Sequence, residues 1–170
     1  MRLCTERLVI DRLKHTDWKG LQKTLADFEH SAYRIYDAAS PIDDGGVKVL
    51  AWYYELRCCY FAIRYRNQMI GFITVTGWRT KEIGYALAKA YQHQGLAYEA
   101  VRAVMDYYTK ERKTKVFVAE AGLKNRPSVR LLERLGFTLV REQETSLRLD
   151  QNGKPIRFIK GRFIKVSSDG

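Results

Sequence analysis

The stretch from Gln92 to Ala97, at the start of the most regular helical pattern in the chain, contains residues suited to binding an anion. Its spacing is Gln92-x-x-Gly95-x-Ala97. Backbone N–H groups in the first turn of a helix have no intrahelical partner, and the helix dipole adds partial positive charge there. Because Gly95 and Ala97 have little or no side chain, a diphosphate could approach these N–H groups closely. Alone, this spacing more often marks an ordinary helix start.

Acidic side chains at two β-rich runs could transfer protons. Glu82 begins the run 82–88, and Glu120 lies near the end of the run 115–121. A general base must lie within hydrogen-bond reach of its substrate, directly or through one water. For each residue alone, a solvent-exposed glutamate is the commoner interpretation. Histidine is a common general base in enzymes, but the place of His93 inside the anion-binding stretch indicates that it faces solvent or phosphate.

Apolar periodicity predicts the elements that position these residues. They follow the order β-α-α-β-β-β-α-β-α-β-β, without a repeat or a linker. This order predicts one mixed α/β domain over residues 1–170, with a central twisted sheet of six to seven strands flanked by about four helices. The expected strands cover 7–13, 60–65, 69–77, 82–88, 115–121, 138–149 and 156–166, and the expected helices cover 18–25, 46–57, 95–112 and 127–136, the last with Arg126 as its N-cap.

The composition limits the class of protein. A formal net charge of +11 favours a polyanionic partner, which could be nucleic acid, an acidic protein surface or a phosphate-rich cofactor. No apolar run approaches the ~18 residues that span a bilayer, and no signal segment follows Met1, so a cytoplasmic protein outside the membrane is expected. Cys4, Cys58 and Cys59 are expected to be free, buried thiols, and they have no metal-binding spacing with the three histidines.

Four sequence segments and the order of elements resemble the GNAT N-acetyltransferase superfamily, over about residues 3–165. The resemblance is greatest to the RimJ/RimL-like branch of ribosomal-protein N-terminal acetyltransferases. Together the segments are far more specific than any one of them. They are Thr5-Glu6-Arg7-Leu8-Val9-Ile10-Asp11-Arg12-Leu13, Glu82-Ile83-Gly84-Tyr85-Ala86-Leu87, Gln92-x-x-Gly95-Leu96-Ala97-Tyr98-Glu99-Ala100 and Asn125-Arg126-Pro127-Ser128-Val129-Arg130-Leu131-Leu132-Glu133-Arg134-Leu135-Gly136-Phe137.

The resemblance implies acetyl-CoA as the acetyl donor, without a metal. It implies that the strands 82–88 and 115–121 run parallel and then diverge, so that the pantetheine arm pairs with the backbone of residues 86–88. An N–H group near Leu87 would then face the thioester oxygen. A plain core strand is the alternative for residues 86–88, and a helix cap is a second role for Asn125. The residues implied to bind the cofactor are Ala86, Leu87, Ala88, Gln92, His93, Gln94, Gly95, Leu96, Ala97, Tyr98, Asn125 and Ser128.

The resemblance also implies which residues move protons. Glu82 is the first choice for the general base, and Glu120 is the second. A serine at the position of Ser128 lies near the CoA sulfur in this branch, while a locally hydrogen-bonded first-turn serine is an equal alternative. Leu132 stands where many members of the superfamily have a proton-donating tyrosine. Because leucine cannot donate, Ser128, a bound water or Tyr85 would take its place.

The acceptor site is expected at the aromatic stretch that contains Tyr33, Tyr36 and Asp37, together with the run 52–54. Tyrosines there could surround an amine and Asp37 could attract its charge, whereas core packing under a long connection is the alternative.

The expected activity is acetyl transfer from acetyl-CoA to a primary amine by direct attack in a ternary complex. The acceptor could be a ribosomal or other protein N-terminus, or a small amine. A homodimer is compatible with this activity, and nucleic acid is not required for it. The rival hypotheses are a basic RNA- or ribosome-binding module and a CoA-binding sensor without turnover.

Overall fold

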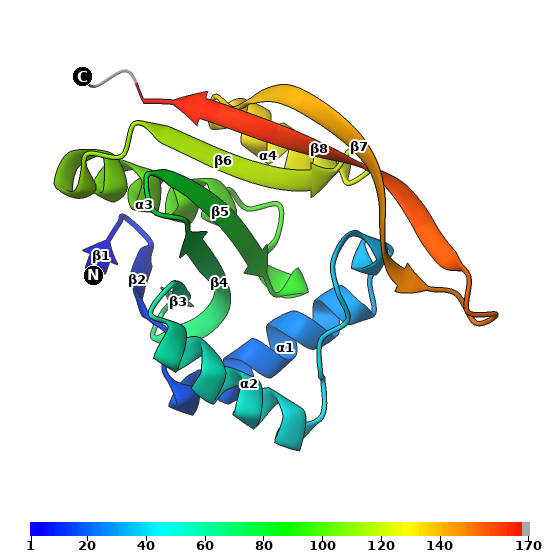
Figure 1. The fold of residues 1–170 in the computed structure, drawn as a ribbon. Coiled ribbons are helices and arrows are strands. Elements are labelled where there is room, and N and C mark those ends of the chain that lie inside the picture. The colour runs from blue at the N-terminus through cyan, green and yellow to red at the C-terminus, as the bar shows by residue number, and fades with distance from the viewer. Residues whose placement is uncertain (168–170) are drawn as a thin grey trace.

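The computed structural model describes residues 1–167, which form one mixed sheet with helices on both faces (Figure 1). Within these residues the sheet has eight strands in the order β1-β2-β3-β4-β5-β6-β8-β7. Neighbouring strands are antiparallel except β5 and β6, which are parallel. The strands are β1 (Arg2–Cys4), β2 (Leu8–Arg12), β3 (Tyr60–Tyr65), β4 (Gln68–Thr76), β5 (Thr80–Leu87), β6 (Val116–Gly122), β7 (Thr138–Leu149) and β8 (Pro155–Val166).

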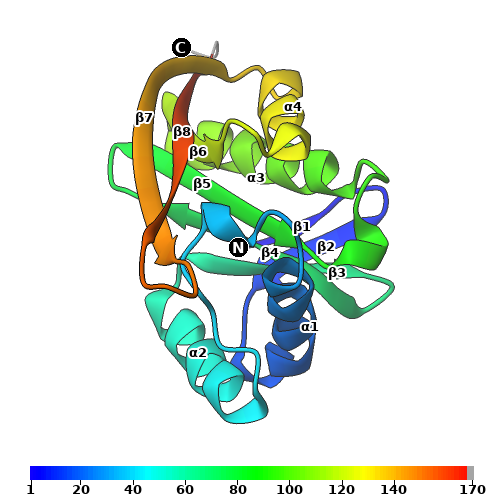
Figure 2. The ribbon, with the colours of Figure 1, turned by 90° about the vertical axis from the view of Figure 1, so that its right-hand side faces the viewer.

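The α-helices form two layers, one on each face of the sheet (Figure 2). Ile73 of β4 belongs to the core cluster that includes α3 and α4, whereas its neighbour Phe72 packs against the cluster formed by α1 and α2. Successive strand residues point to opposite faces, so the two helix pairs lie on opposite faces. The helices are α1 (Trp18–Glu29), α2 (Asp44–Arg57), α3 (Leu96–Arg112) and α4 (Arg126–Arg134), with 3-10 turns η1 (His15–Asp17), η2 (Arg34–Tyr36) and η3 (Lys89–Tyr91).

The two cores differ in size. The larger one lies between the sheet and α3 with α4, and it buries Val101, Val104 and Met105 as their helical spacing predicts. The smaller one joins α1 and α2 through Leu21 and Val47. Helices α1 and α2 pack on β4 and β3, while η2 contacts β7 and β8. On the α1–α2 face, the two helices therefore cover β3 and β4, and η2 lies against β7 and β8.

The predicted mixed α/β class is confirmed, but the sheet has eight strands in the described residues instead of six to seven. The additional strand is β1, in which Leu3 pairs with Ile10 of β2. Three residues are too few to show a period of two, so the sequence pattern could not reveal this strand. The long last hairpin, β7 and β8, agrees with its predicted bounds to within one residue.

Two local predictions are wrong. The N-cap of α4 is Asn125, whose side chain accepts a hydrogen bond from the Ser128 N–H, whereas Arg126 is the first helical residue. An asparagine side chain can accept from the first turn and an arginine side chain cannot, which explains the difference. The cysteines are not buried as a group, because Cys4 and Cys58 are exposed and Cys59 is half-buried.

Candidate active site

The parallel strands β5 and β6 separate after a short stretch of pairing. They pair only from Thr80 with Val116 to Glu82 with Val118. Strand β5 nevertheless continues to Leu87, and β6 pairs onward with β8. The predicted divergence is confirmed, and within residues 1–167 it leaves the second half of β5 without a strand partner on that side.

The backbone of β5 turns hydrogen-bonding groups into this opening. The Ala88 N–H donates to the Ile70 carbonyl at 2.8 Å, on the β4 side. Backbone groups of successive strand residues alternate in direction, so those of Tyr85 and Leu87 point toward β6. The Leu87 carbonyl accepts a hydrogen bond from the Gln92 side chain at 2.9 Å. The Leu87 N–H therefore faces the opening.

The loop between β5 and α3 adopts the conformation of an anion cradle. His93 and Gly95 both have a positive φ, of 60° and 76°. Gly95 is the N-cap of α3 and makes no side-chain cap, so the N–H groups of Leu96, Ala97 and Tyr98 point outward from the helix start. Left-handed residues before a helix turn successive N–H groups into one concavity, which suits a phosphate.

Arg7 is a cation at the cradle that the sequence analysis quoted without assigning it a role. Its guanidinium donates to the Gln94 carbonyl at 3.0 Å and to Glu99, in the first turn of α3, at 2.7 Å. Burial alone would raise the pKa of Glu99, but hydrogen bonds from Thr5 and Arg7 outweigh it and keep that pKa low. A β-carbon on Gly95 would lie 3.5 Å from Arg7 Nη2.

Tyr85 and Ser128 meet across the opening. The Tyr85 hydroxyl lies 3.0 Å from Ser128 Oγ on α4. Burial raises the pKa of Tyr85 to about 12, against a lowering by the Ser128 hydrogen bond, so the hydroxyl keeps its proton at neutral pH. Leu132, one turn further along α4, is fully buried in the core. The structure thus places a tyrosine hydroxyl beside α4 although Leu132 supplies none.

The two candidate bases lie in different surroundings on one face of the sheet. Glu82 is exposed at the last residue pair before the strands diverge. Glu120 accepts from Lys160 at 2.7 Å and from Arg162 at 3.2 Å. Burial alone would raise the pKa of Glu120, but Lys160 and Arg162 outweigh it and keep that pKa below its ordinary value. Glu120 is therefore the poorer proton acceptor of the two.

Of the residues expected at the acceptor site, the two tyrosines pack against other rings, and the aspartate bonds to the backbone. The Tyr36 ring covers Gly122 at the end of β6, where an added β-carbon would collide with it, and it meets Phe158 edge to face at 5.1 Å. Tyr33 lies 6.4 Å from Tyr36, ring to ring. The Asp37 side chain accepts from the Ala38 N–H. Tyr36 thus borders the opening from the β6 side.

Residues 52–54 do not join these tyrosines. Trp52 stacks on His15 at 4.0 Å, and Tyr54 stacks on Tyr60 at 3.7 Å. Trp52 and Tyr53 are half exposed on the outer side of α2.

Long-range polar contacts hold the loop after α1 in place, and no pattern in the sequence predicts them. The Arg148 guanidinium of β7 makes two hydrogen bonds of 2.7 Å to the Glu29 carboxylate. It also donates to the Asp37 carbonyl at 2.8 Å. The pair is mostly buried, with 13% of each side chain exposed. Arg148 thereby ties the loop after α1 to the β7–β8 hairpin.

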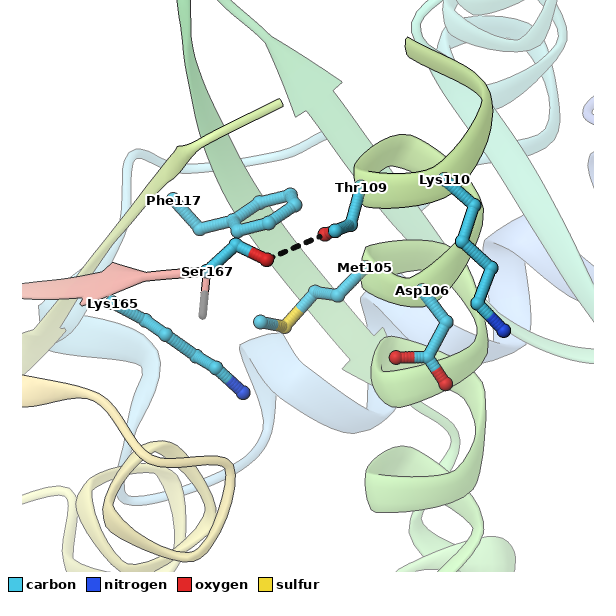
Figure 3. A pocket seen from close by; sticks show the side chains of 7 residues that line it. All are labelled: Met105, Asp106, Thr109, Lys110, Phe117, Lys165 and Ser167. Carbon is cyan, nitrogen blue, oxygen red and sulfur yellow. Dashed lines mark hydrogen bonds between the residues drawn. The ribbon is translucent and has the colours of Figure 1, made fainter. Parts of the chain in front are cut away.

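A separate pocket lies at the other end of α3 (Figure 3). Ser167 Oγ donates to Thr109 Oγ1 at 3.3 Å there, beside Met105 and Phe117. Thirteen residues separate Thr109 from the first residue of α3, which is about 20 Å along a helix. This pocket is therefore not part of the opening between β5 and β6.

Neither a metal cluster nor a membrane-spanning helix is found in residues 1–167. No group of three or more His, Cys, Asp or Glu side chains among them could hold a metal ion. None of the helices described is long and apolar enough to cross a membrane.

Comparison with known proteins identifies the family. The pattern of the family described as acetyltransferase (GNAT) domain matches residues 7–138. Because this match covers most of the chain, the protein belongs to the GNAT acetyltransferase family. It is 27% identical over 142 residues to the uncharacterized N-acetyltransferase YnaD of Bacillus subtilis (strain 168), covering 81% of this chain and 82% of that protein.

Two solved structures of acetyltransferases share this fold. The ribosomal-protein-S5-alanine acetyltransferase of Vibrio fischeri has a TM-score of 0.75 at 18% identity, over 99% of this chain and 98% of that one. RimL, a ribosomal L7/L12 alpha-N-protein acetyltransferase in complex with coenzyme A, has a TM-score of 0.79 at 15% identity, over the whole of both chains. The RimJ/RimL-like branch is thus represented among proteins with this fold.

Proposed function

We propose that the protein transfers an acetyl group from acetyl-CoA to a primary amine by direct attack, with residues 1–170 acting as one domain. The observation that carries this proposal is the divergence of β5 from β6 next to the cradle. Free strand backbone suits the amide-rich pantetheine arm, and free helix N–H groups suit the diphosphate. The complex of RimL with coenzyme A supports the choice of cofactor.

The cofactor would bind mainly through backbone groups. In this proposal the Leu87 N–H donates to the thioester oxygen, where charge develops during attack. Arg7 adds a fixed positive charge beside the diphosphate, since Glu99 already orients it. The residues proposed to contact acetyl-CoA are Ala86, Leu87, Ala88, Gln92, His93, Gln94, Gly95, Leu96, Ala97, Tyr98, Asn125 and Ser128.

Glu82 is proposed as the general base. The attacking amine must lose a proton, and Glu82 is exposed at the point where the strands diverge, so it could take that proton directly or through one water. Glu120 is less suited because two cations already occupy its oxygens. The tetrahedral intermediate then collapses and expels the CoA thiolate.

Tyr85 and Ser128 are proposed to stabilise the leaving thiolate by hydrogen bonding. A thiol has a pKa near 8.5, well below the value of about 12 for Tyr85, so full proton transfer from the tyrosine would be unfavourable. A hydrogen bond from either hydroxyl still stabilises the developing negative charge on sulfur. Solvent would supply the final proton.

The acceptor is proposed to approach from the α1–α2 face, past Tyr36, with Tyr33 and Asp37 nearby. A protein N-terminus is the favoured acceptor, because two proteins with this fold are ribosomal-protein acetyltransferases by name. A cytoplasmic location and a homodimer stay predictions.

Calorimetric titration of the folded protein with acetyl-CoA, and then with free CoA, tests the proposal. One-to-one binding in the micromolar range is expected, followed by turnover with at least one amine in a panel of peptides and small amines. Absence of binding would overturn the proposal, and salt-sensitive RNA binding in its place would favour the RNA-binding rival. Binding without turnover on any amine would favour the sensor.

A further inference from the structure

A pocket of charged side chains lies on the sheet beside the proposed acceptor site. Glu120, Arg141, Gln143, Lys160 and Arg162 line it, from the three adjacent strands β6, β8 and β7. Three of these residues are cationic and one is anionic. Because the pKa of Glu120 stays low, this carboxylate is charged at neutral pH and the pocket has a net charge of about +2.

The strand register places like charges opposite each other. Arg162 of β8 pairs with Glu120 on one side and with Arg141 on the other. Like charges directly opposite in a sheet are unfavourable unless something neutralises them. Glu120 is already shared between Lys160 and Arg162, and within residues 1–167 Arg141 has no ion-pair partner. An anion between the two guanidinium groups would relieve this repulsion.

A bulge in β7 creates this arrangement. The register shifts between Leu139 and Arg141, so that Arg141 and not Val140 stands opposite Arg162. Bulges re-aim side chains and are common beside active sites. The bulge therefore brings a second guanidinium to the face of the sheet that also carries Glu82 and Glu120.

The pocket lies close to the position of the reacting amine. Glu82 pairs with Val118, and Glu120 follows two residues later on the same face, which is about 7 Å along a strand. One strand further across, by about 5 Å, is Arg162. Tyr36 borders the far side, where its ring covers Gly122. An extended peptide with its N-terminus at Glu82 would reach the pocket with roughly its third or fourth residue.

We propose that this pocket binds carboxylate side chains of the acceptor, so that the enzyme prefers polypeptides with acidic residues at positions three and four. This inference rests on the proposed function, because it uses the place of the amine at Glu82. The pocket is open to solvent, with 43% of the Arg162 side chain exposed, which suits a chain passing over it.

Two hexapeptides with free amino termini test the inference, one with glutamate and one with glutamine at positions three and four. The wild-type protein is expected to show a KM about tenfold lower for the acidic peptide, the effect of about two solvent-exposed charge pairs, with kcat unchanged. Arg141→Ala is expected to reduce this preference to about twofold. Arg157→Ala, which removes one charge from the same hairpin outside the pocket, should keep the full preference.

A binding measurement separates failure of this inference from failure of the proposed function. Fluorescence anisotropy of the labelled peptides, with protein saturated in CoA, reports the preference without acetyl transfer. Equal affinity for both peptides, or a preference that survives Arg141→Ala, would overturn the inference even in an active enzyme. A 20-nucleotide RNA that binds more tightly than the acidic peptide, and loses affinity in Arg141→Ala, would also overturn it in favour of nucleic acid.

Discussion

At the opening between β5 and β6, the side proposed for the cofactor is built largely from neighbours in sequence, whereas the side proposed for the acceptor joins distant segments. Gln92 bonds to Leu87, five residues earlier. On the acceptor side, Arg148 bonds to Glu29 across 119 residues and to the Asp37 carbonyl across 111. The first part is mainly a local backbone motif, to which Arg7 is added from a distant segment, and the second is a tertiary arrangement of side chains.

This difference has a functional consequence. A site made of backbone N–H groups and glycine suits a ligand whose structure is always the same. The proposed cofactor, CoA, is such a ligand. A site made by long-range side-chain contacts can change its specificity by substitution without loss of the fold. Variants that fill the cradle should therefore weaken cofactor binding strongly, and variants on the proposed acceptor side should change rate, stability or preference.

Gly95→Glu is expected to have the largest effect. The substitution places bulk and negative charge in the cradle and competes for Arg7, so acetyl-CoA affinity should fall at least about 100-fold in calorimetry. Gly153→Glu is the matched control. Gly153 has nearly the same φ, 75° against 76°, but no atom lies within 4 Å of its added β-carbon. Similar affinity in both variants would show that the cradle is misassigned.

Glu82→Gln should lower kcat about 100-fold, since loss of a general base typically costs two to four orders of magnitude. Acetyl-CoA affinity should be unchanged, because Glu82 lies on the acceptor face. Glu120→Gln serves as the comparison and should keep kcat within about threefold of wild type. Rates measured with saturating peptide and acetyl-CoA decide between them, and a fully active Glu82→Gln variant would remove Glu82 from the mechanism.

The local geometry of the cradle and of the start of α4 depends on short stretches of sequence, for the same physical reason. The positions of Gly95 and Asn125 follow from backbone conformation and capping, which depend on a few adjacent residues. Strands and helices with clear periods were found within a few residues of their bounds, while the short β1 was missed. The Arg148–Glu29 pair, the β7 bulge and the role of Arg7 depend on tertiary contacts, which a single sequence does not reveal.

Arg148→Ala should destabilise the fold by about 2 kcal/mol, because it leaves a mostly buried Glu29 carboxylate without its cation. Urea denaturation monitored by tryptophan fluorescence measures this change. Arg157→Ala removes the exposed pair with Glu144 from the same hairpin, and it should cost less than about 0.5 kcal/mol. Equal losses in the two variants would mean that Arg148 does not hold the loop after α1.

The same pair predicts how stability depends on pH. Hydrogen bonds from Arg148 outweigh burial and hold the pKa of Glu29 below its ordinary value of 4.5. A lowered carboxyl pKa adds stability above the unfolded-state value, and this is lost as pH falls through the folded-state value. The stability difference between wild type and Arg148→Ala should therefore shrink from about pH 6 to about pH 3. A constant difference over this range would argue against an ionic origin.

Tyr85→Phe is expected to have a smaller effect than Glu82→Gln, lowering kcat about tenfold while acetyl-CoA affinity is kept, because one hydrogen bond to the leaving sulfur is lost. Tyr108→Phe is the control. Tyr108 is also a half-buried tyrosine whose pKa is raised by burial, but it lies near the C-terminal end of α3, away from the opening. With a pKa of about 12, Tyr85 should add no ionisation to the rate profile below about pH 9.

A double variant shows whether Tyr85 and Ser128 act as one unit. Their hydroxyls are 3.0 Å apart, so either could turn toward the sulfur while the other supports it. Ser128→Ala alone should lower kcat about threefold, because Tyr85 would still donate. The double variant should then be little slower than Tyr85→Phe, since residues that act together show non-additive losses. Fully additive losses would mean that the two hydroxyls act separately.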